Sequence, residues 1–399
     1  MFCQLRLAYR KTAAGAVLAL SATAANAGII IPAGEWTIDI GGNVNSFFSQ
    51  SRARGNANVY GGIAGGGNSA SVNSQGTGLL PNFLSVSGST RQNDLDVTWL
   101  ISIQPGGDVG SAGQYGTQNN RQAYLTFGDK SWGSVKLGKD LGVFASDAIL
   151  NDMTLLGVGA GAGLGNATYG RIGTGFQYAD WKSQVAYTTP NMNGFQATIA
   201  LTQGWNATAT TNAGSLSTSQ RGGSNPAYEG KASYSFAAND VTGKVWVSGI
   251  GQKIGGGTVA TDDPVAYAAD IGANVNFAGL GLTGYYYSGQ GIGSTFQFLD
   301  GYSSAGKARD SDGGYVQATY VLPTKTKAGL SWGQSNLDRA SGESNTTLVK
   351  TNEMWTAGLY HPLTKHLNLV GEYSHIKSEN QAGAENKTNS VSLGGIIFF

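Results

Sequence analysis

The chain ends in Asn389-Ser-Val-Ser-Leu-Gly-Gly-Ile-Ile-Phe-Phe399, with no residue after the last aromatic. In a strand, apolar residues such as Leu393 and Ile397 would share one face, and serines such as Ser390 the other. An apolar strand left unpaired at a free terminus would be an exposed edge, and exposed edges template aggregation. We therefore expect this strand to pair with the first strand of the mature chain, near Trp36, and so to close a barrel.

The first 27 residues have the composition of a secretory signal peptide. Three basic residues precede an apolar run from Thr12 to Ala24, and Ala25-Asn26-Ala27 matches a small-x-small cleavage site. The apolar run is too short for a membrane-spanning helix, and a buried N-terminal helix is the alternative interpretation. The sequence thus predicts a signal peptide over residues 1–27 and a single domain over residues 28–399.

Cysteine and charge usage exclude several classes of protein. The only cysteine, Cys3, lies in the predicted signal peptide, so we expect no disulfide, catalytic thiol or cysteine-bound metal in the mature chain. Removal of the signal peptide takes away three positive charges and no negative ones, which lowers the formal net charge from +1 to about −2. A chain this close to neutral lacks the basic surface that binding to nucleic acid requires.

The composition fits neither a soluble domain nor a helical membrane protein. Charged residues make up 12% of the chain, against about 25% in typical soluble domains, and 62 residues are glycine. No stretch after residue 27 reaches the ~18 apolar residues of a membrane helix. A transmembrane β-barrel explains both facts, because lipid-facing and water-facing residues alternate along each of its strands.

Segments with period-2 alternation recur along the mature chain, each about as long as a tilted membrane-crossing strand. A soluble β-sandwich would show the same alternation, so the lengths of the links between segments must distinguish a sandwich from a barrel. Short links such as Asp129-Lys130-Ser131 alternate with long ones such as Phe144–Thr168 and Trp205–Pro226, which is the pattern of periplasmic turns and outer loops. The predicted fold is all-β: a 16-stranded antiparallel transmembrane β-barrel. Its strands are expected near residues 36–49, 80–91, 94–104, 120–128, 132–142, 169–180, 194–204, 227–237, 241–252, 265–277, 281–290, 313–322, 325–335, 353–361, 366–377 and 388–399.

One part of the chain resembles a known family. The segments NRQAYLTFGDKSWGSVKLGKDLGVFASDAILNDM (120–153) and YTTPNMNGF (187–195) resemble the general porins of Gram-negative bacteria, and the second resembles a turn of their β-proteobacterial members. The turn Tyr320-Val-Leu-Pro-Thr-Lys-Thr326 and the terminal Phe399 match the family pattern as well. The resemblance covers the mature chain loosely and residues 119–201 well.

This resemblance implies that the third loop, Phe144–Thr168, folds into the barrel and narrows it. Asp147 and Asp152 would then face Arg121 and Arg171 across a pore constriction. A barrel of sixteen strands leaves an aqueous channel, and opposed charges in a narrow wet gap sort solutes by charge and size. Lys136, on the polar face of the strand before the loop, is a further candidate for the pore wall.

Simpler roles stay open for these residues. The two aspartates could be turn or N-cap residues of a short helix, and the two arginines could be rim charges. The sequence also departs from the family, because Thr154-Leu155-Leu156 follows where a third acid is usual, and Phe83 stands where a wall arginine is usual. The sequence therefore does not predict whether the channel prefers cations or anions.

The resemblance further implies an outer-membrane protein that forms a homotrimer, contacts lipid and lipopolysaccharide, and is recognised by the barrel-assembly machinery through Phe399. The predicted function is passive diffusion of small hydrophilic solutes and ions, without catalytic residues, metal or cofactor. A channel that prefers a sugar, an organic acid or an aromatic solute is the alternative.

Other candidate sites have weaker signals. The run Gly157–Gly165 lacks the spacing and the lysine of a phosphate-binding loop, and His361 and His366 lack a third metal ligand. Tyr124 and Tyr285-Tyr286-Tyr287 could line a pore, but the girdle at the lipid interface is the favoured interpretation.

Two other functions are possible for a barrel. An outer-membrane enzyme would need a nucleophile, a base and an orienting residue at the rim, and only His375 lies near the predicted outer rim among the histidines. An adhesin would use the long loops, and this role could coexist with transport.

Overall fold

The computed structural model describes residues 28–67, 71–106, 118–162, 167–204, 226–254, 265–303 and 305–399. The predicted signal peptide with Cys3, and most of the predicted loop Trp205–Pro226, lie outside the described residues.

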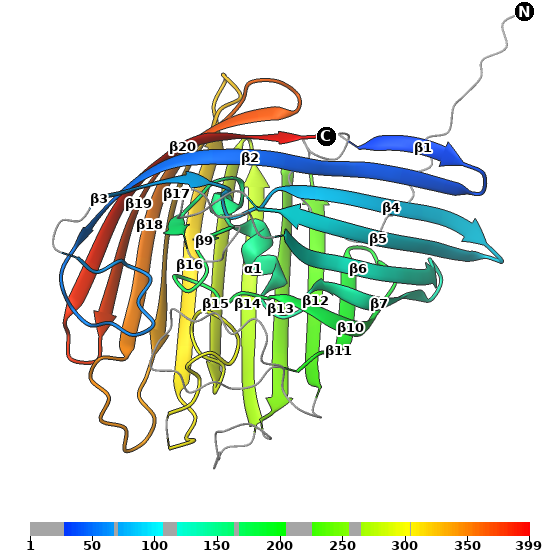
Figure 1. The fold of residues 1–399 in the computed structure, drawn as a ribbon. Helices are drawn as coiled ribbons and strands as arrows, with labels where there is room; N and C mark the ends of the chain where they lie inside the picture. The colour runs from blue at the N-terminus through cyan, green and yellow to red at the C-terminus, as the bar shows by residue number, and fades with distance from the viewer. Residues whose placement is uncertain are drawn as a thin grey trace, which may run out of the picture.

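The wall of the molecule is a closed ring of sixteen antiparallel strands (Figure 1), as predicted from the alternating segments. Neighbouring strands follow chain order, as in a meander. The wall consists of β2 (Trp36–Arg54), β4 (Phe83–Gln92), β5 (Leu95–Pro105), β6 (Gln118–Asp129), β7 (Gly133–Leu141), β10 (Trp181–Thr188), β11 (Phe195–Thr202), β12 (Ala227–Ala238), β13 (Val241–Lys253), β14 (Val265–Phe277), β15 (Leu280–Gln290), β16 (Asp310–Val321), β17 (Lys327–Leu337), β18 (Val349–Pro362), β19 (Leu367–Asn380) and β20 (Glu385–Phe398).

Six short elements supplement the wall. Two of them, β1 (Ile29–Ala33) and β3 (Ser71–Gly76), pair with β2. The others are α1 (Ser146–Asn151), η1 (Met153–Leu156), β8 (Ala160–Ala162) and β9 (Thr168–Gly170), which all belong to the connection between β7 and β10.

The last strand closes the ring by pairing with the first. β20 runs antiparallel to β2 over twelve registered pairs, from Asn43 opposite Phe398 to Arg54 opposite Lys387. The backbones of Gly42 and Phe399 exchange two further hydrogen bonds, of 2.8 and 3.1 Å. The expectation that the terminal apolar strand pairs with the segment after Trp36 is therefore confirmed.

The two faces of the wall differ as the alternation predicts. Outward side chains are apolar and exposed, as at Val316 and Leu330, both 58% exposed, and Leu393, 59% exposed. The adjacent inward positions, such as Gln317 on β16 and Ser392 on β20, are mostly polar or small. No helix in the described ranges has the length and hydropathy to cross a membrane.

One predicted strand is misplaced. Residues 169–180 were expected to form the sixth strand, but that strand is β10, which begins at Trp181 and pairs with β7 and β11. Gly170 and Gly173 adopt φ values of 56° and 75°, which an L-residue in a strand does not. Apart from the short β9, residues 169–180 form non-strand backbone before β10, and period 2 alone did not reveal those turns.

Chain segments fill much of the interior. The inner loop, defined as residues 142–162 and 167–180, contacts inward-facing side chains from β12 to β19, and α1 lies within the ring of strands (Figure 1). Residues 291–303 of the connection between β15 and β16 are also largely buried, and Phe296 pairs by a β-bridge with Tyr178 of the inner loop.

Aromatic residues contribute to this inner packing. Tyr285 and Tyr287 are buried inside the barrel and only Tyr286 faces outward, so the girdle interpretation is wrong for the first two. Tyr124 likewise lies beneath the inward Lys136, 4.6 Å from its ammonium to the ring centroid. Ile396, near the end of β20, is buried in the same apolar cluster as Phe47.

Candidate functional site

The inner loop is held at its start by a carboxylate of the barrel wall. Glu229 on β12 accepts hydrogen bonds from the backbone N–H groups of Val143 and Phe144, at 2.7 and 2.8 Å. Its other oxygen lies 2.6 Å from the ammonium of Lys182 on β10, and both side chains are fully buried. Lys182 also contacts Gln297 of the β15–β16 connection. This pair therefore joins the inner loop, the wall and the second buried connection.

A second wall carboxylate holds the beginning of α1. Ala145, the residue before the helix, has φ 62°, and its N–H donates to Asp270 on β14 at 3.2 Å. The hydroxyls of Ser248 and Tyr285 donate to the same carboxylate, at 2.6 and 3.0 Å. One turn further on, the Tyr315 hydroxyl donates to the carbonyl of Ala148 at 2.8 Å. These contacts fix α1 against β13 to β16.

A third wall carboxylate holds the loop after η1. Glu372 on β19 accepts from the N–H groups of Val158 and Gly159, both at 2.8 Å. Tyr360 donates to its other oxygen at 2.6 Å. The amide of Gln317 meets the loop as well, accepting from the Met153 N–H at 2.7 Å. The wall thus holds the loop backbone by charge-assisted hydrogen bonds, which are stronger than neutral ones.

Asp147 on α1 lies between two lysines of the wall. Its carboxylate is 2.8 Å from the ammonium of Lys231 on β12 and also contacts Lys244 on β13. The aspartate is 4% exposed at its side chain, whereas the lysines are 21% and 33% exposed. Burial alone would raise the pKa of Asp147, but the two lysines outweigh it and hold that pKa below its usual value. The solvent-accessible part of this cluster therefore carries positive charge.

Asp152 and Arg171 meet in the buried part of the inner loop. The Nε of Arg171 is 3.8 Å from Oδ1 of Asp152, and both side chains are fully buried. Nη1 of Arg171 donates to the carbonyl of Met354 at 3.0 Å, while Nε and Nη2 have no hydrogen-bond partner among the described residues. Burial raises the pKa of Asp152 and lowers that of Arg171. Arg171 was expected on a strand of the wall, but it follows β9 within the inner loop.

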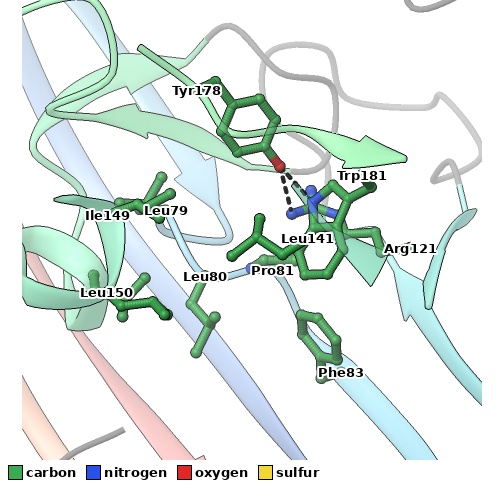
Figure 2. Close-up of a pocket in the computed structure, with 11 residues that line it drawn as sticks. Leu79, Leu80, Pro81, Phe83, Arg121, Leu141, Ile149, Leu150, Tyr178 and Trp181 are labelled. Atoms are coloured by element: carbon green, nitrogen blue, oxygen red, sulfur yellow. Dashed lines mark hydrogen bonds between the residues drawn. The ribbon is translucent and has the colours of Figure 1, made fainter. Parts of the chain in front are cut away.

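Arg121 lies beside an apolar cavity of about 30 Å³ at the edge of the inner loop. Arg121 lies in a β-bulge of the pairing between β5 and β6, and both Arg121 and Gln122 are buried. Its guanidinium is 5.7 Å from the ring centroid of Trp181 and 3.5 Å from the Tyr178 hydroxyl. Figure 2 shows apolar side chains around this group: Leu79, Leu80, Pro81, Phe83, Leu141, Ile149 and Leu150.

Lys136 lies on the inward face of β7, as its place on the polar face predicts. Its ammonium contacts Asp140 on the same strand. Asp140 in turn accepts a hydrogen bond from Gln122 at 3.0 Å. Lys136 thus belongs to a separate, charge-balanced group on the wall.

The structure brings together only some of the predicted residues. Asp152 and Arg171 form a pair, whereas Asp147 contacts lysines instead of an arginine. The sequence reasoning missed Lys231 and Lys244. Both occupy polar positions of alternating segments, so their inward direction could have been inferred, but their proximity to α1 could not.

The remaining candidates do not form a site in the described part of the chain. That part contains no cluster of three or more His, Cys, Asp or Glu side chains able to hold a metal ion. His361 and His366 instead make turn contacts, with Thr326 at 3.0 Å and with the Phe398 carbonyl at 3.1 Å. His375 contacts Asn389 at 2.7 Å, in register with it across β19 and β20.

The family profile described as Gram-negative porin matches residues 13–381. No curated protein matches the chain in sequence.

Solved structures with a similar fold include three outer-membrane proteins. The outer membrane channel DcaP of Acinetobacter baumannii superposes with a TM-score of 0.68 at 17% identity, covering 91% of this chain and 97% of that one. An anion-selective porin from Comamonas acidovorans gives 0.62 at 16% identity, covering 92% and 100%. The trimer form of OmpT from Vibrio cholerae gives 0.56 at 12% identity, covering 91% and 99%.

Proposed function

Because this chain belongs to the Gram-negative porin family, we propose that the inner loop and its charged contacts form the constriction of its channel. The protein is an outer-membrane β-barrel for passive diffusion of small hydrophilic solutes and ions. A sixteen-stranded wall is too wide for its own side chains to fill, so it leaves room for an aqueous passage. The position of the inner loop inside the barrel then determines the width and the charge of that passage.

The cluster of Asp147, Lys231 and Lys244 is the observation that carries this proposal. It joins the loop helix to the wall, and its lysines keep contact with solvent while the carboxylate does not. The pairs Lys182–Glu229 and Lys136–Asp140 balance their own charges. The constriction consequently has a modest preference for anions.

The five residues named from the sequence have different roles in this proposal. Lys136 lines the passage, Asp147 lies behind Lys231 and Lys244 and offsets part of their charge, and Arg121 forms part of the wall. Asp152 and Arg171 act as an internal brace of the loop, because both are fully buried. Opposed charges at a narrow point sort ions by sign, so selectivity depends on the accessible lysines and on the carboxylate of Asp147 that offsets them.

Single-channel recording in a planar bilayer with a salt gradient tests the proposal. We expect stepwise openings and a reversal potential whose sign shows that anions permeate more readily than cations. The Lys231→Gln and Lys244→Gln variants should both reduce that potential, and the Lys253→Gln variant, which changes an exposed lysine at the end of β13, serves as the control. Absence of conductance across all voltages would refute a diffusion channel, and unchanged potentials in both lysine variants would refute this constriction.

The assembly is also a proposal. We expect a homotrimer in contact with lipid and lipopolysaccharide, delivered by the barrel-assembly machinery that reads Phe399. The trimer form of the similar barrel from Vibrio cholerae and the exposed apolar outer face support it. Insertion events with conductance in three equal steps would agree with a trimer, and a monomer mass in mild detergent would contradict it.

The family and the similar solved structures are channels, and we propose that this chain catalyses no reaction. His375, the histidine considered for a catalytic role, faces the outer side of β19 beside Trp355, at 6.0 Å between ring centroids. Ester or peptide hydrolysis by the purified barrel that disappears in the His375→Ala variant would contradict this. An adhesive role of the long loops would coexist with transport.

A further inference from the structure

A carboxylate near the seam of the barrel has an oxygen without a partner. Asp39 lies on β2, with β1 on one side and β4 on the other, opposite Ile30 and Ser87 respectively. Its Oδ1 is buried and accepts no hydrogen bond from the described residues. A buried carboxylate oxygen that lacks a donor is costly, so this position calls for a cation or a donor.

The backbone of Gly28 lies directly against that oxygen. A Cβ added to Gly28 would be 2.1 Å from Oδ1 and 3.2 Å from Oδ2 of Asp39, so a larger residue would have to shift. The nitrogen of a residue is about 2.5 Å from its own Cβ position, which places the Gly28 nitrogen within about 5 Å of Oδ1. Residue 28 is also the first residue after the predicted cleavage site Ala25-Asn26-Ala27.

We propose that Asp39 binds the α-ammonium group of Gly28 that signal-peptide removal creates. Hydrolysis of the Ala27–Gly28 amide consumes one water, leaves a carboxylate on Ala27, and frees the Gly28 amine, which takes up a proton. An α-amino group has an ordinary pKa near 7.7–8.0 and is mainly charged at neutral pH. Before cleavage the same nitrogen is a neutral amide and offers Asp39 no charge. The proposal rests on the predicted signal peptide and is independent of the channel's selectivity.

The location gives this ion pair a structural role. A Cβ on Gly41 would lie 3.8 Å from the Cα of Gly28 and 3.2 Å from the carbonyl of Phe399, so Gly28, Phe399 and Asp39 meet at one place. Figure 1 shows β1 and the C-terminus at the same end of the barrel. β20 pairs with β2 only from residue 43 onward, and β1 covers residues 36–40. The ion pair therefore fastens the short strand that protects an otherwise open edge of the seam.

A thermodynamic cycle on the refolded mature chain tests the proposal. Two N-termini, a free amine and an Nα-acetyl group, are combined with two side chains, the native Asp39 and the Asp39→Asn substitution. The readout is the temperature at which the compact, heat-modifiable form is lost on gel electrophoresis. Each single change should lower that temperature by about 2 °C, and the double change should lower it no further than one change alone. The control is Asp94→Asn, a fully exposed aspartate in the turn after β4, which should cause no shift.

Two outcomes would overturn the proposal. One is that acetylation and Asp39→Asn lower the temperature independently, so that their effects add. The other is that acetylation of the native chain leaves the temperature unchanged, and this comparison needs no variant to fold. The Gly28→Ala variant gives a second check, because its Cβ would push the terminus away from Asp39 and should reproduce the loss.

Discussion

At the scale of single residues, charge in the interior depends on which member of each pair stays accessible. Asp147 is enclosed by α1 and two lysines, whereas both members of the Asp152–Arg171 pair are enclosed. The alternating pattern of the sequence places Asp147 and Asp152 on a loop, but no spacing in the sequence distinguishes their two environments. They depend on contacts between residues up to ninety-seven positions apart, as for Asp147 and Lys244.

The Asp147→Asn variant should shift selectivity toward anions. It removes the negative charge that offsets Lys231 and Lys244, and leaves both ammonium groups at the passage. In a tenfold salt gradient we expect the reversal potential to move by several millivolts in the anion direction. The Asp152→Asn variant is the matched control: it should leave the potential unchanged and destabilise the loop, because it leaves the buried Arg171 unpaired. Equal shifts in both variants would contradict this division of roles.

The pH dependence of selectivity follows from the protonation of Asp147. The lysines hold the pKa of Asp147 below its usual value despite burial. A carboxyl with a lowered pKa in the fold contributes stability above its unfolded pKa, and loses it as pH falls through the folded pKa. The contacts should thus persist from pH 7 to about pH 4, and a step toward anions should appear only below that range. Recordings at descending pH check this, and a step that persists in the Asp147→Asn variant would assign it to another group.

At the scale of elements, the inner loop depends on the wall more than on its own secondary structure. Its helix α1 has six residues and no side-chain cap, and an isolated helix of this length is not stable. Glu229, Asp270 and Glu372 instead accept hydrogen bonds from its backbone at three points. A loop anchored in this way holds its position across a wet channel without a hydrophobic core of its own.

The Glu372→Gln variant should loosen the end of the inner loop. One oxygen of Glu372 accepts from both Val158 and Gly159 and the other from Tyr360. A glutamine has only one accepting atom, so one set of donors loses its partner, at a cost of about 1–3 kcal/mol. We expect noisier single-channel currents and faster hydrogen exchange at the Val158 and Gly159 amides. The control is Glu353→Gln on β18, which lies opposite Lys377 on the other face; unchanged exchange in Glu372→Gln would contradict the anchoring role.

The strands of the wall were predictable from the sequence, because contact with lipid and pairing with neighbours impose alternation on them. The segments inside the barrel were less predictable. Strand number, order and closure followed from the alternation and from the length of the links. The sixth strand was misplaced because residues 169–180 alternate as a strand does, while their glycines turn the chain inward. Tyr285 and Tyr287 were misjudged for a related reason. Alternation shows that a strand has two faces, but it does not show that the inner loop packs against the inward face and buries tyrosines there.

At the scale of the whole molecule, the barrel has one seam, and both β1 and the C-terminal Phe399 lie there. The ring of Phe399 contributes to this region by packing as well as by its position in the chain. A Cβ on Gly42 would be 3.1 Å from the tip of that ring, so the ring lies over the backbone of β2. The backbone hydrogen bonds between Gly42 and Phe399 do not depend on the side chain.

The Phe399→Ala variant separates packing from recognition by the assembly machinery. If the ring is read during assembly, the amount of folded barrel in the outer membrane should fall several-fold, while refolding of the purified chain into detergent should proceed as in the native protein. The control is Phe48→Ala on the same seam, an outward aromatic that is 44% exposed, which should assemble normally in cells. Heat-modifiable gel mobility measures the folded fraction in both settings. An equal loss in cells and in detergent would instead assign the effect of Phe399 to its packing on Gly42, since no machinery is present in detergent to read the ring.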